Sequence, residues 1–228
     1  MTVFEMRECT RPECKLRFPL SPEQHRGAFC PRCGAPLKVV SAPFKHQSPD
    51  LMEDQPFRRL TVLLDNLRSA HNVGAIFRTA DGAGVRQLCL CGITPTPDDN
   101  PAIGKTALGS EDHLFWSYHP NGLDLALELQ EQGSHLIALE STPDARPFYQ
   151  FFNDSQRSSE ILLIVGNEKA GIDPGILELC DDVLFLSMAG EKESLNVAVA
   201  FGIAVYSLAF VQAGKPCFPA GEFGNRDD

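Results

Sequence analysis

Three short segments, far apart in the chain, carry residue types suited to chemistry. Residues 72–78 place the amide of Asn72 and the guanidinium of Arg78 on one predicted helix. Residues 166–171 form a Gly-x-x-x-x-Gly turn, and residues 194–197 read Ser-Leu-Asn-Val at the start of the most apolar stretch of the chain. Folding alone does not require these polar side chains at these places. Together they predict a site assembled from distant segments.

The glycine turn follows an apolar strand, which is also the setting of a phosphate-binding loop. A phosphate loop continues with Lys and then Ser or Thr after its second glycine, whereas this chain has Ile172 and Asp173. Glu168 inside the turn would also repel a triphosphate. We therefore expect a neutral or cationic adenosyl compound, held by backbone groups that glycine allows to approach closely. The segment Gly82-x-Gly84 is likewise a poor dinucleotide fingerprint.

Four of the eight cysteines lie in two close pairs within the first 33 residues. Cys9 and Cys14 are separated by four residues, Cys30 and Cys33 by two, and fifteen residues lie between the pairs. Two thiolates from each of two tight turns can close a tetrahedron around Zn²⁺. The segment resembles a zinc ribbon, and it has too little apolar mass to fold without such a metal. Disulfides, which a reducing compartment disfavours, and free cysteines in an unstructured tail are the alternatives.

The elements that must position the three segments follow an α/β pattern, because apolar runs alternate with helix-length segments. The run 161–165 is hydrophobic throughout, as in a parallel strand buried on both faces. Residues 124–132 are predicted as a surface helix ended by Gly133, and residues 195–210 as a buried helix too short to cross a membrane. Six strands are expected, at residues 60–64, 87–91, 113–118, 136–139, 161–165 and 183–186. Ligands of such sheets bind at the carboxyl ends of strands, where Gly166 falls.

Length and composition are those of a soluble main domain with a small addition. The 228 residues are 43% hydrophobic and 22% charged, as in ordinary globular proteins. We divide the chain into a cysteine-bearing domain at 1–40, a linker at 41–57, a main domain at 58–213 and a tail at 214–228. The N-terminus lacks the layout of a secretory signal, so we expect the protein in the cytoplasm.

The formal charge of −10 argues against a nucleic-acid partner, because phosphate contacts require Lys and Arg. Its distribution weakens that argument. Residues 1–59 hold ten basic and seven acidic side chains, and the remainder holds ten and twenty-three. Local charge decides which surface can meet a phosphate backbone. Acidity that only keeps a cytosolic enzyme soluble is the other explanation of the total.

The three segments, in this order, resemble the motifs of the SpoU (TrmH-like) branch of the SPOUT superfamily, RNA ribose 2′-O-methyltransferases that use S-adenosylmethionine. The likeness covers roughly residues 60–210. The matching positions are Asn72, Gly74 and Arg78 in the first motif, residues 164–168 with Gly171 in the second, residues 186–197 in the third, and residues 105–109 between the first two. The resemblance implies a mostly parallel sheet flanked by helices, a C-terminal trefoil knot and an obligate homodimer. Periodicity alone gives no sign of a knot.

The resemblance also implies roles for particular residues. The cofactor would lie against Gly166, Leu186, Met188 and Leu195. The catalytic group would consist of Asn72, Arg78, Glu168, Ser194 and Asn196. A guanidinium stays protonated at accessible pH, so Arg78 is a poor base. We expect it to bind the adjacent phosphate and to stabilise the developing alkoxide, while the phosphate or a water takes the proton.

Several of these side chains have a structural alternative. Asn72 could orient the ribose or cap the helix that follows, two roles that are compatible, and Ser194 and Asn196 have the same ambiguity. If Asn196 is buried, it needs a polar partner. Glu168 either secures its turn or contacts substrate across the dimer.

Three functions are compatible with the motifs. The first is an active ribose methyltransferase on tRNA or rRNA, and the second is a zinc-bearing knotted dimer that holds RNA or ribosomal protein without turnover. The third is a base methyltransferase. A site that had lost its activity need not retain all five polar side chains, so their presence favours an enzyme. Arg78 in the first motif favours the ribose over a base as the group that is methylated.

Overall fold

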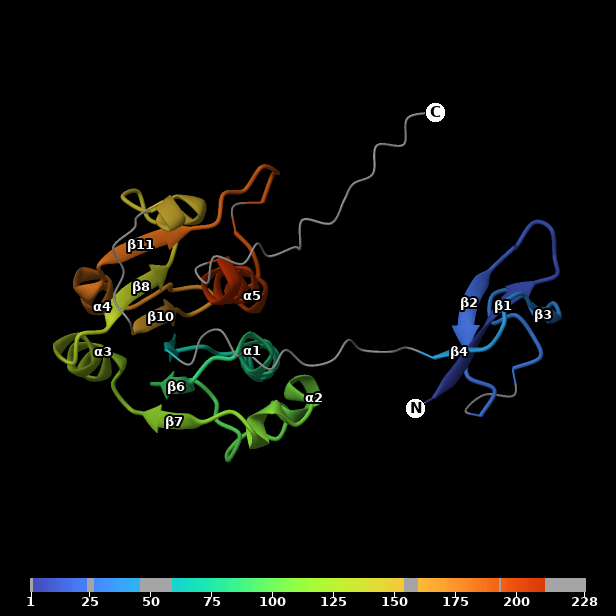
Figure 1. Cartoon of the computed structure of the whole chain (residues 1–228), viewed down its shortest axis with the longest axis horizontal. Helices are drawn as coiled ribbons and strands as arrows, with labels where there is room; N and C mark the ends of the chain where they lie inside the picture. Colours follow the sequence, from blue (N-terminus) through green and yellow to red (C-terminus); the bar gives the residue numbers. More distant parts are fainter. Residues whose placement is uncertain (1, 24–26, 46–58, 154–159, 193, 212–228) are drawn as a thin grey trace. The chain divides into compact units, whose positions relative to one another are not determined.

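A computed structural model describes residues 2–23, 27–45, 59–153, 160–192 and 194–211 of the chain (Figure 1). The chain divides into two compact units, residues 1–53 and 54–228. Most of the predicted linker and the whole predicted tail lie outside the described residues.

The small unit is an antiparallel sheet built around one central strand. Strand β1 (Val3–Cys9) pairs with β2 (Arg17–Leu20), with β3 (Leu37–Val39) and, near its start, with β4 (Phe44–Lys45). Strand β4 lies within the segment that the sequence assigns to a linker. The fold of this unit therefore continues past residue 40, which corrects the predicted start of the linker.

The main unit is a seven-stranded sheet in which every strand pairing is parallel. Its order is β7-β6-β5-β10-β8-β11-β9. The bounds are β5 Leu60–Asp65, β6 Gln87–Cys91, β7 Trp116–His119, β8 His135–Leu139, β9 Arg146–Pro147, β10 Ile161–Val165 and β11 Asp182–Phe185. The α/β class and five of the six expected strands are confirmed nearly at their predicted bounds. Strand β7 begins three residues later than expected, since residues 113–115 belong to the connection that follows the 3-10 turn at residues 110–112. The two-residue β9 carries too few residues for any periodicity.

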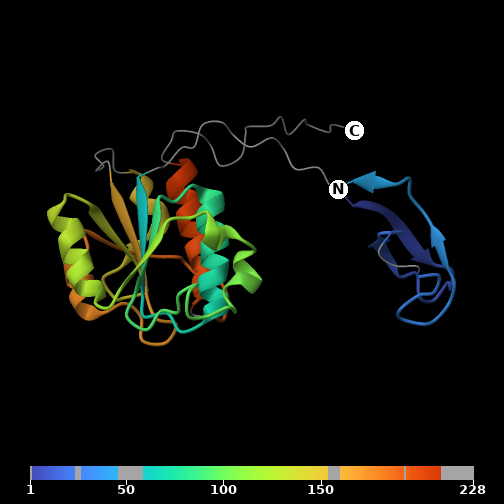
Figure 2. The same cartoon turned by 90° about the horizontal axis from the view of Figure 1, so that it is seen from below.

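Helices cover both faces of this sheet, which gives three layers (Figures 1 and 2). Helix α1 (Ala70–Ala83) and helix α5 (Val197–Tyr206) pack together on one face, and α3 (Gly122–Glu131) and α4 (Pro174–Leu179) pack on the other. The surface helix predicted at 124–132 is therefore confirmed, with its start two residues earlier at the Asn121 cap. The remaining short elements are α2 (Gly104–Ala107), η1 (Ser110–Asp112), η2 (Phe148–Asn153) and the π-helical turn η3 (Ser207–Val211).

The two-sided burial follows from the alternation of side chains along each strand. In β10, Leu163 and Val165 join the core beneath α1 and α5, whereas Leu162 and Ile164 join the core beneath α3 and α4. All four side chains are buried. A strand with helices on both faces needs apolar residues at consecutive positions, which is the pattern that the sequence shows.

Gly74 of the first motif has a packing role. A Cβ atom added there would lie 2.2 Å from Thr106 Oγ1 and 2.3 Å from the carbonyl oxygen of Ile103. Thr106 Oγ1 in turn donates to the carbonyl of His71 on α1 (3.0 Å). The glycine therefore lets the segment that contains α2 lie directly against α1. This contact is a physical reason why Gly74 and residues 105–109 both occur among the family-like positions.

The buried helix predicted at 195–210 is corrected in two respects. It begins at Val197, and after Tyr206 it continues as the π-helical turn. Only one face is covered, because Val199, Ile203 and Tyr206 are exposed. None of the helices in the described part of the chain combines the length and the hydropathy that crossing a membrane requires.

Candidate functional site

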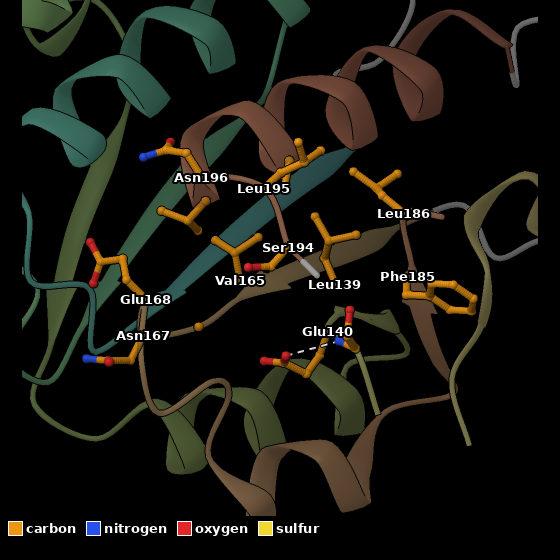
Figure 3. A pocket seen from close by; sticks show the side chains of 14 residues that line it. Leu139, Glu140, Val165, Asn167, Glu168, Phe185, Leu186, Ser194, Leu195 and Asn196 are labelled. Carbon is orange, nitrogen blue, oxygen red and sulfur yellow. Dashed lines mark hydrogen bonds between the residues drawn. The ribbon is translucent and has the colours of Figure 1, made fainter. Parts of the chain in front are cut away.

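A cleft of about 230 Å³ opens at the carboxyl ends of β8, β10 and β11 (Figure 3). It is lined by Leu139, Glu140, Ser141, Val165, Gly166, Asn167, Glu168, Phe185, Leu186, Ser194, Leu195, Asn196, Val197 and Ala200. Two of the three segments singled out in the sequence thus form walls of one cavity. The expectation that the glycine turn lies at the carboxyl end of a parallel strand is confirmed, since Gly166 directly follows β10.

The third segment joins the cleft through a chain of hydrogen bonds. Asn196 Nδ2 donates to Asn72 Oδ1 (3.1 Å), and Asn72 Nδ2 donates to Glu168 Oε1 (3.0 Å). These residues come from α5, α1 and the turn after β10. One residue from each motif therefore takes part in a single polar contact at the rim of the cleft, where Figure 3 shows Glu168 and Asn196 on the same side.

The structure shows which polar residues cap α1 and α5. Ser69 caps α1 by accepting from the backbone N–H of Asn72, so Asn72 is not the cap. Asn196 caps α5 by accepting from the backbone N–H groups of Ala198 and Val199, so Ser194 is not the cap of that helix. Asn196 is exposed and yet has a partner at each end of its amide.

Glu168 secures the start of α1. Its carboxylate accepts from the backbone N–H groups of Arg68 (3.0 Å) and Ser69 (3.1 Å) as well as from Asn72. Partial burial acts to raise the pKa of Glu168, but these hydrogen bonds outweigh it and hold the pKa below its usual value. Glu168 is therefore charged at neutral pH and ties the glycine turn to α1, which favours the first of its two predicted roles.

Three residues that sequence reasoning missed hold the glycine turn in place. Glu140 Oε2 accepts from the backbone N–H of Ile172 (3.1 Å), and Asp65 Oδ2 accepts from that of Asp173 (2.9 Å). The carbonyl of Asn66 accepts from Asn167 Nδ2 (2.6 Å). Each of the three lies at or just past the carboxyl end of β5 or β8.

Asp65 is the most buried of these anchors. Burial raises the pKa of its carboxyl above the usual value, although the hydrogen bonds from Asp173 and Asn66 act against that rise. The available signal in the sequence was a polar residue closing an apolar strand, as Asp65 closes β5 and Glu140 follows β8. Such a residue faces the ligand edge of a parallel sheet.

The apolar wall of the cleft includes two of the predicted cofactor residues. Leu186 and Leu195 line it together with Leu139 and Val165, and Figure 3 shows these four side chains around the same space. Gly166 lines it as well. Met188, the remaining predicted contact, is half-buried and is not among the described residues that line the cleft.

Arg78 lies apart from the cleft of its own chain. It follows Asn72 by six residues on α1, which at about 100° per residue places the two side chains roughly 120° apart around the helix. The guanidinium is exposed and does not line the cleft in the part of the chain that the structure describes. Of the five predicted catalytic residues, four therefore gather at the cleft or its rim and one does not.

In the small unit, the four predicted zinc ligands converge. Their Sγ atoms all lie within 4.8 Å of one another. The closest pairs join the two turns, with Cys9 and Cys33 at 3.5 Å and Cys14 and Cys30 at 3.8 Å. A disulfide requires about 2.05 Å between sulfurs, so these four cysteines are not joined to one another by disulfides.

The distances match a tetrahedral metal site. Thiolates at about 2.3 Å from a central zinc lie roughly 3.8 Å from one another. The two turns that present them are tight, since Cys14 N donates to the carbonyl of Arg11 and Gly34 N to that of Cys30. Gly34 takes the left-handed conformation at φ 70°, as the sharp second turn requires.

Comparison with known proteins gives a consistent picture. The family model described as the SpoU rRNA Methylase family matches residues 59–206. A tRNA (guanosine(18)-2′-O)-methyltransferase of Thermus thermophilus is 33% identical over 147 residues, which cover 64% of this chain and 72% of that protein.

Two solved structures share the fold. The TrmH/SpoU tRNA modifying enzyme of A. aeolicus has a TM-score of 0.58 and 26% identity, covering 73% of this chain and 84% of that chain. The SpoU methyltransferase AviRb of Streptomyces viridochromogenes, in complex with the cofactor AdoMet, has a TM-score of 0.57 and 26% identity, covering 78% and 69%. With three motifs meeting at one cleft and the family model spanning most of the main unit, the chain belongs to the SpoU rRNA methylase family.

Proposed function

We propose that this protein is an RNA methyltransferase that transfers a methyl group from S-adenosylmethionine to a ribose 2′-hydroxyl of tRNA or rRNA in the cytoplasm. The observation that carries the proposal is the contact of Asn72, Glu168 and Asn196, which unites the three motifs beside one cleft. The names of the relatives support it, since they are tRNA and rRNA 2′-O-methyltransferases.

The cleft has the properties that this cofactor requires. Leu186 and Leu195 offer apolar surface for an adenine ring, and Glu140 and Glu168 offer negative charge near a sulfonium or an ammonium group. S-adenosylmethionine supplies an electrophilic methyl group to this site. The residues of the chain would then have to hold the reactants in place and limit the access of water, which are the main demands of a displacement that removes charge.

Gly166 gives a test of the cofactor site. A Cβ atom there would lie 2.4 Å from the backbone carbon of Gly171, so Gly166→Ala must push the two arms of the turn apart. We expect cofactor affinity in isothermal titration calorimetry to fall by about 5- to 100-fold, because overpacking costs roughly 1 to 3 kcal/mol. Gly27→Ala, in the small unit, is the control, since a Cβ atom there would meet only Leu20 Cδ2, at 3.7 Å. Equal affinity in the two variants would contradict this placement of the cofactor.

We further propose that the enzyme acts as a homodimer through the exposed face of α5 and that Arg78 works in the cleft of the partner subunit. Val199 is 52% exposed, and Ile203 and Tyr206 are exposed beside it on the same helix. An apolar face of this kind marks an interaction surface. Arg78 is exposed on the neighbouring helix α1 and outside its own cleft. A second copy on this face would complete the site.

A carboxylate introduced on the exposed face of α5 tests the dimer. Val199→Glu and Ile203→Glu should convert the protein from twice the chain mass to the chain mass in sedimentation equilibrium, because an unpaired carboxylate inside an apolar interface is strongly unfavourable. Leu127→Glu, on α3 and 39% exposed, is the matched control and should leave the mass unchanged. A wild-type protein of single-chain mass at micromolar concentration would exclude the dimer.

Zinc is the third part of the proposal. Among the described residues of the small unit, only Cys9, Ser21 and Cys30 are buried, so this unit has almost no hydrophobic core. A four-thiolate zinc site would contribute about 10 to 16 kcal/mol of binding free energy to folding. We also propose that the main unit has the trefoil knot implied by the family resemblance, at its C-terminal end.

One assay tests the activity against both alternatives. Purified protein, labelled S-adenosylmethionine and total RNA should give methylated RNA in which the label survives as an alkali-resistant dinucleotide, because a 2′-O-methyl group blocks cleavage of the adjoining phosphodiester. Label released in mononucleotides would indicate a base methyltransferase. Cofactor titration without heat, together with RNA that stays unlabelled, would favour the non-catalytic RNA-binding dimer.

A further inference from the structure

In the small unit, an exposed aromatic ring and three exposed cationic side chains adjoin the cysteine turns. Phe29 is 65% exposed and immediately precedes Cys30. Arg11 and Lys15 flank the first cysteine turn, and Arg32 lies inside the second. All four side chains are exposed. We call these four residues the knuckle surface.

Backbone contacts connect the segment of Phe29 with the first cysteine turn, which carries Arg11 and Lys15. Phe29 forms an isolated antiparallel bridge with Pro36, and the carbonyl of Pro36 accepts from the backbone N–H of Thr10 (3.0 Å). Thr10 adjoins Arg11, whose N–H donates to Cys9 Sγ (3.4 Å). Lys15 N donates to the carbonyl of Arg11 (3.1 Å), which closes the first turn. Phe29 and the first cysteine turn are therefore neighbours of the same segment, at Pro36.

The cations of the knuckle surface differ from those on the strands of the unit in their lack of a close carboxylate partner. On the strands, Arg7 pairs with Glu5, while Arg17 and Lys38 both pair with Glu8. By contrast, none of Arg11, Lys15 and Arg32 lies within ion-pair distance of a carboxylate that the structure describes, although Lys15 is the weakest of the three cations that help to lower the pKa of Glu8. Glu13 is exposed on the same turn and leaves the knuckle surface with a formal excess of two positive charges before the metal site is counted.

Two explanations fit cations beside a thiolate cluster. They can offset the negative charge of a four-thiolate zinc site, which needs no aromatic residue. They can also meet the phosphates of a nucleic acid, and then an exposed ring has a use, since bases stack on aromatic side chains within basic grooves. The exposure of Phe29 favours the second explanation, because a ring that served the unit alone would gain more from burial.

We propose that the knuckle surface binds an unpaired segment of RNA, with a base stacked on Phe29 and the flanking phosphates on Arg11, Lys15 and Arg32. An unpaired segment is required because bases inside a duplex are already stacked and cannot cover a side-chain ring. The inference rests on the proposed function for the identity of the polymer. It assigns to the small unit a grip on RNA outside the modified nucleotide.

The test uses the full-length zinc-loaded protein and a fluorescein-labelled oligouridine of about twelve nucleotides, with a duplex of equal length for comparison. Phe29→Ala should weaken binding of the single strand by about 5- to 100-fold in fluorescence anisotropy. Arg11→Ala with Arg32→Ala should lower the slope of log affinity against log salt by roughly 0.7 for each phosphate contact removed. The duplex should bind more weakly than the single strand and should be insensitive to Phe29→Ala.

Matched controls lie on β4 of the same unit. Phe44 is 41% exposed, and Lys45 follows it. Phe44 pairs with Phe4, and Lys45 pairs with Val3. Phe4 precedes Cys9 by about five residues on β1, which corresponds to roughly 17 Å along the strand. Phe44→Ala and Lys45→Ala should change affinity by less than about twofold. Zinc content, measured for each variant, shows that the unit remains folded.

The results separate this inference from the proposed activity. Unchanged affinity of Phe29→Ala with zinc retained, or equal losses in the β4 controls, would overturn the RNA grip even if the enzyme methylates RNA. The opposite result is also possible. If the wild-type protein methylates no RNA, but only the knuckle variants have lower affinity for oligouridine, RNA binding by the knuckle surface is supported and the proposed activity is refuted.

Discussion

Replacing Arg78 with alanine is expected to lower the rate of methyl transfer by at least about 100-fold, while affinity for S-adenosylmethionine changes by less than about threefold. The guanidinium is exposed on α1 and outside the cofactor cleft of its own chain, so its loss should not disturb that cleft. Its proposed work is to bind a phosphate and stabilise the developing alkoxide. Single-turnover kinetics and calorimetry measure the two quantities separately.

Two further variants control this experiment. Arg78→Lys keeps the positive charge but loses the planar, two-pronged donor, so it should recover only a small part of the rate. Arg86→Ala removes another exposed arginine, whose guanidinium pairs with Glu160 at 3.5 Å, and should leave the rate near that of the wild type. Normal turnover in Arg78→Ala would refute the assigned role.

A mixed dimer decides whether Arg78 acts in its own subunit or in the partner. One chain carries Arg78→Ala and keeps its cleft, and the other carries Gly166→Ala and keeps its arginine. If Arg78 acts across the interface, one of the two composite sites is intact and the mixed dimer should work at about half the wild-type rate. If it acts within its own chain, both sites are damaged and the mixed dimer should be as inactive as either parent.

Removing zinc is expected to unfold the small unit and leave the main unit intact. The described part of the small unit buries only two cysteines and one serine, so nothing else can replace the metal as a core. Chelation, or Cys30→Ser, should abolish protection of residues 2–23 and 27–45 in hydrogen exchange. The melting temperature of the main unit and its cofactor affinity should remain unchanged, because its cores contain none of these residues.

Elemental analysis should find one zinc per chain in the wild type and almost none in Cys30→Ser. Cys180→Ser is the matched control. Its sulfur contacts the carbonyl of Ile176 at 3.2 Å in the main unit, far along the chain from the cluster, and a hydroxyl can make the same contact. Full protection of the small unit after complete removal of metal would show that zinc has no structural role.

The strands of the main unit were predictable because their signal is local. A central strand of the parallel sheet must present apolar side chains to both helical layers, and β10 (Ile161–Val165) has five consecutive buried apolar residues. The cysteine cluster was predictable for a related reason, since short turns bring paired ligands together whatever the rest of the fold does.

For helix α5, the local sequence pattern could not predict which face of the helix is covered. It is apolar on all sides, so periodicity has no polar face from which to tell the covered side from the open one. The sequence therefore predicted a buried helix, and the exposed face of Val199, Ile203 and Tyr206 became visible only after α1 had packed against the opposite side.

By itself, then, the sequence determined the α/β class, the convergence of zinc-spaced cysteines as an expectation, and which three motifs belong to one site. Tertiary structure alone decided how that site is held. Glu168 bonds to the start of α1 from about a hundred residues away, and Glu140 and Asp65 anchor the glycine turn from other strands. The physical reason is that each of these hydrogen bonds joins a side-chain carboxylate of one segment to a backbone N–H of a distant segment. Every residue except proline carries such an N–H, so the local sequence does not show which one the fold will bring to the carboxylate.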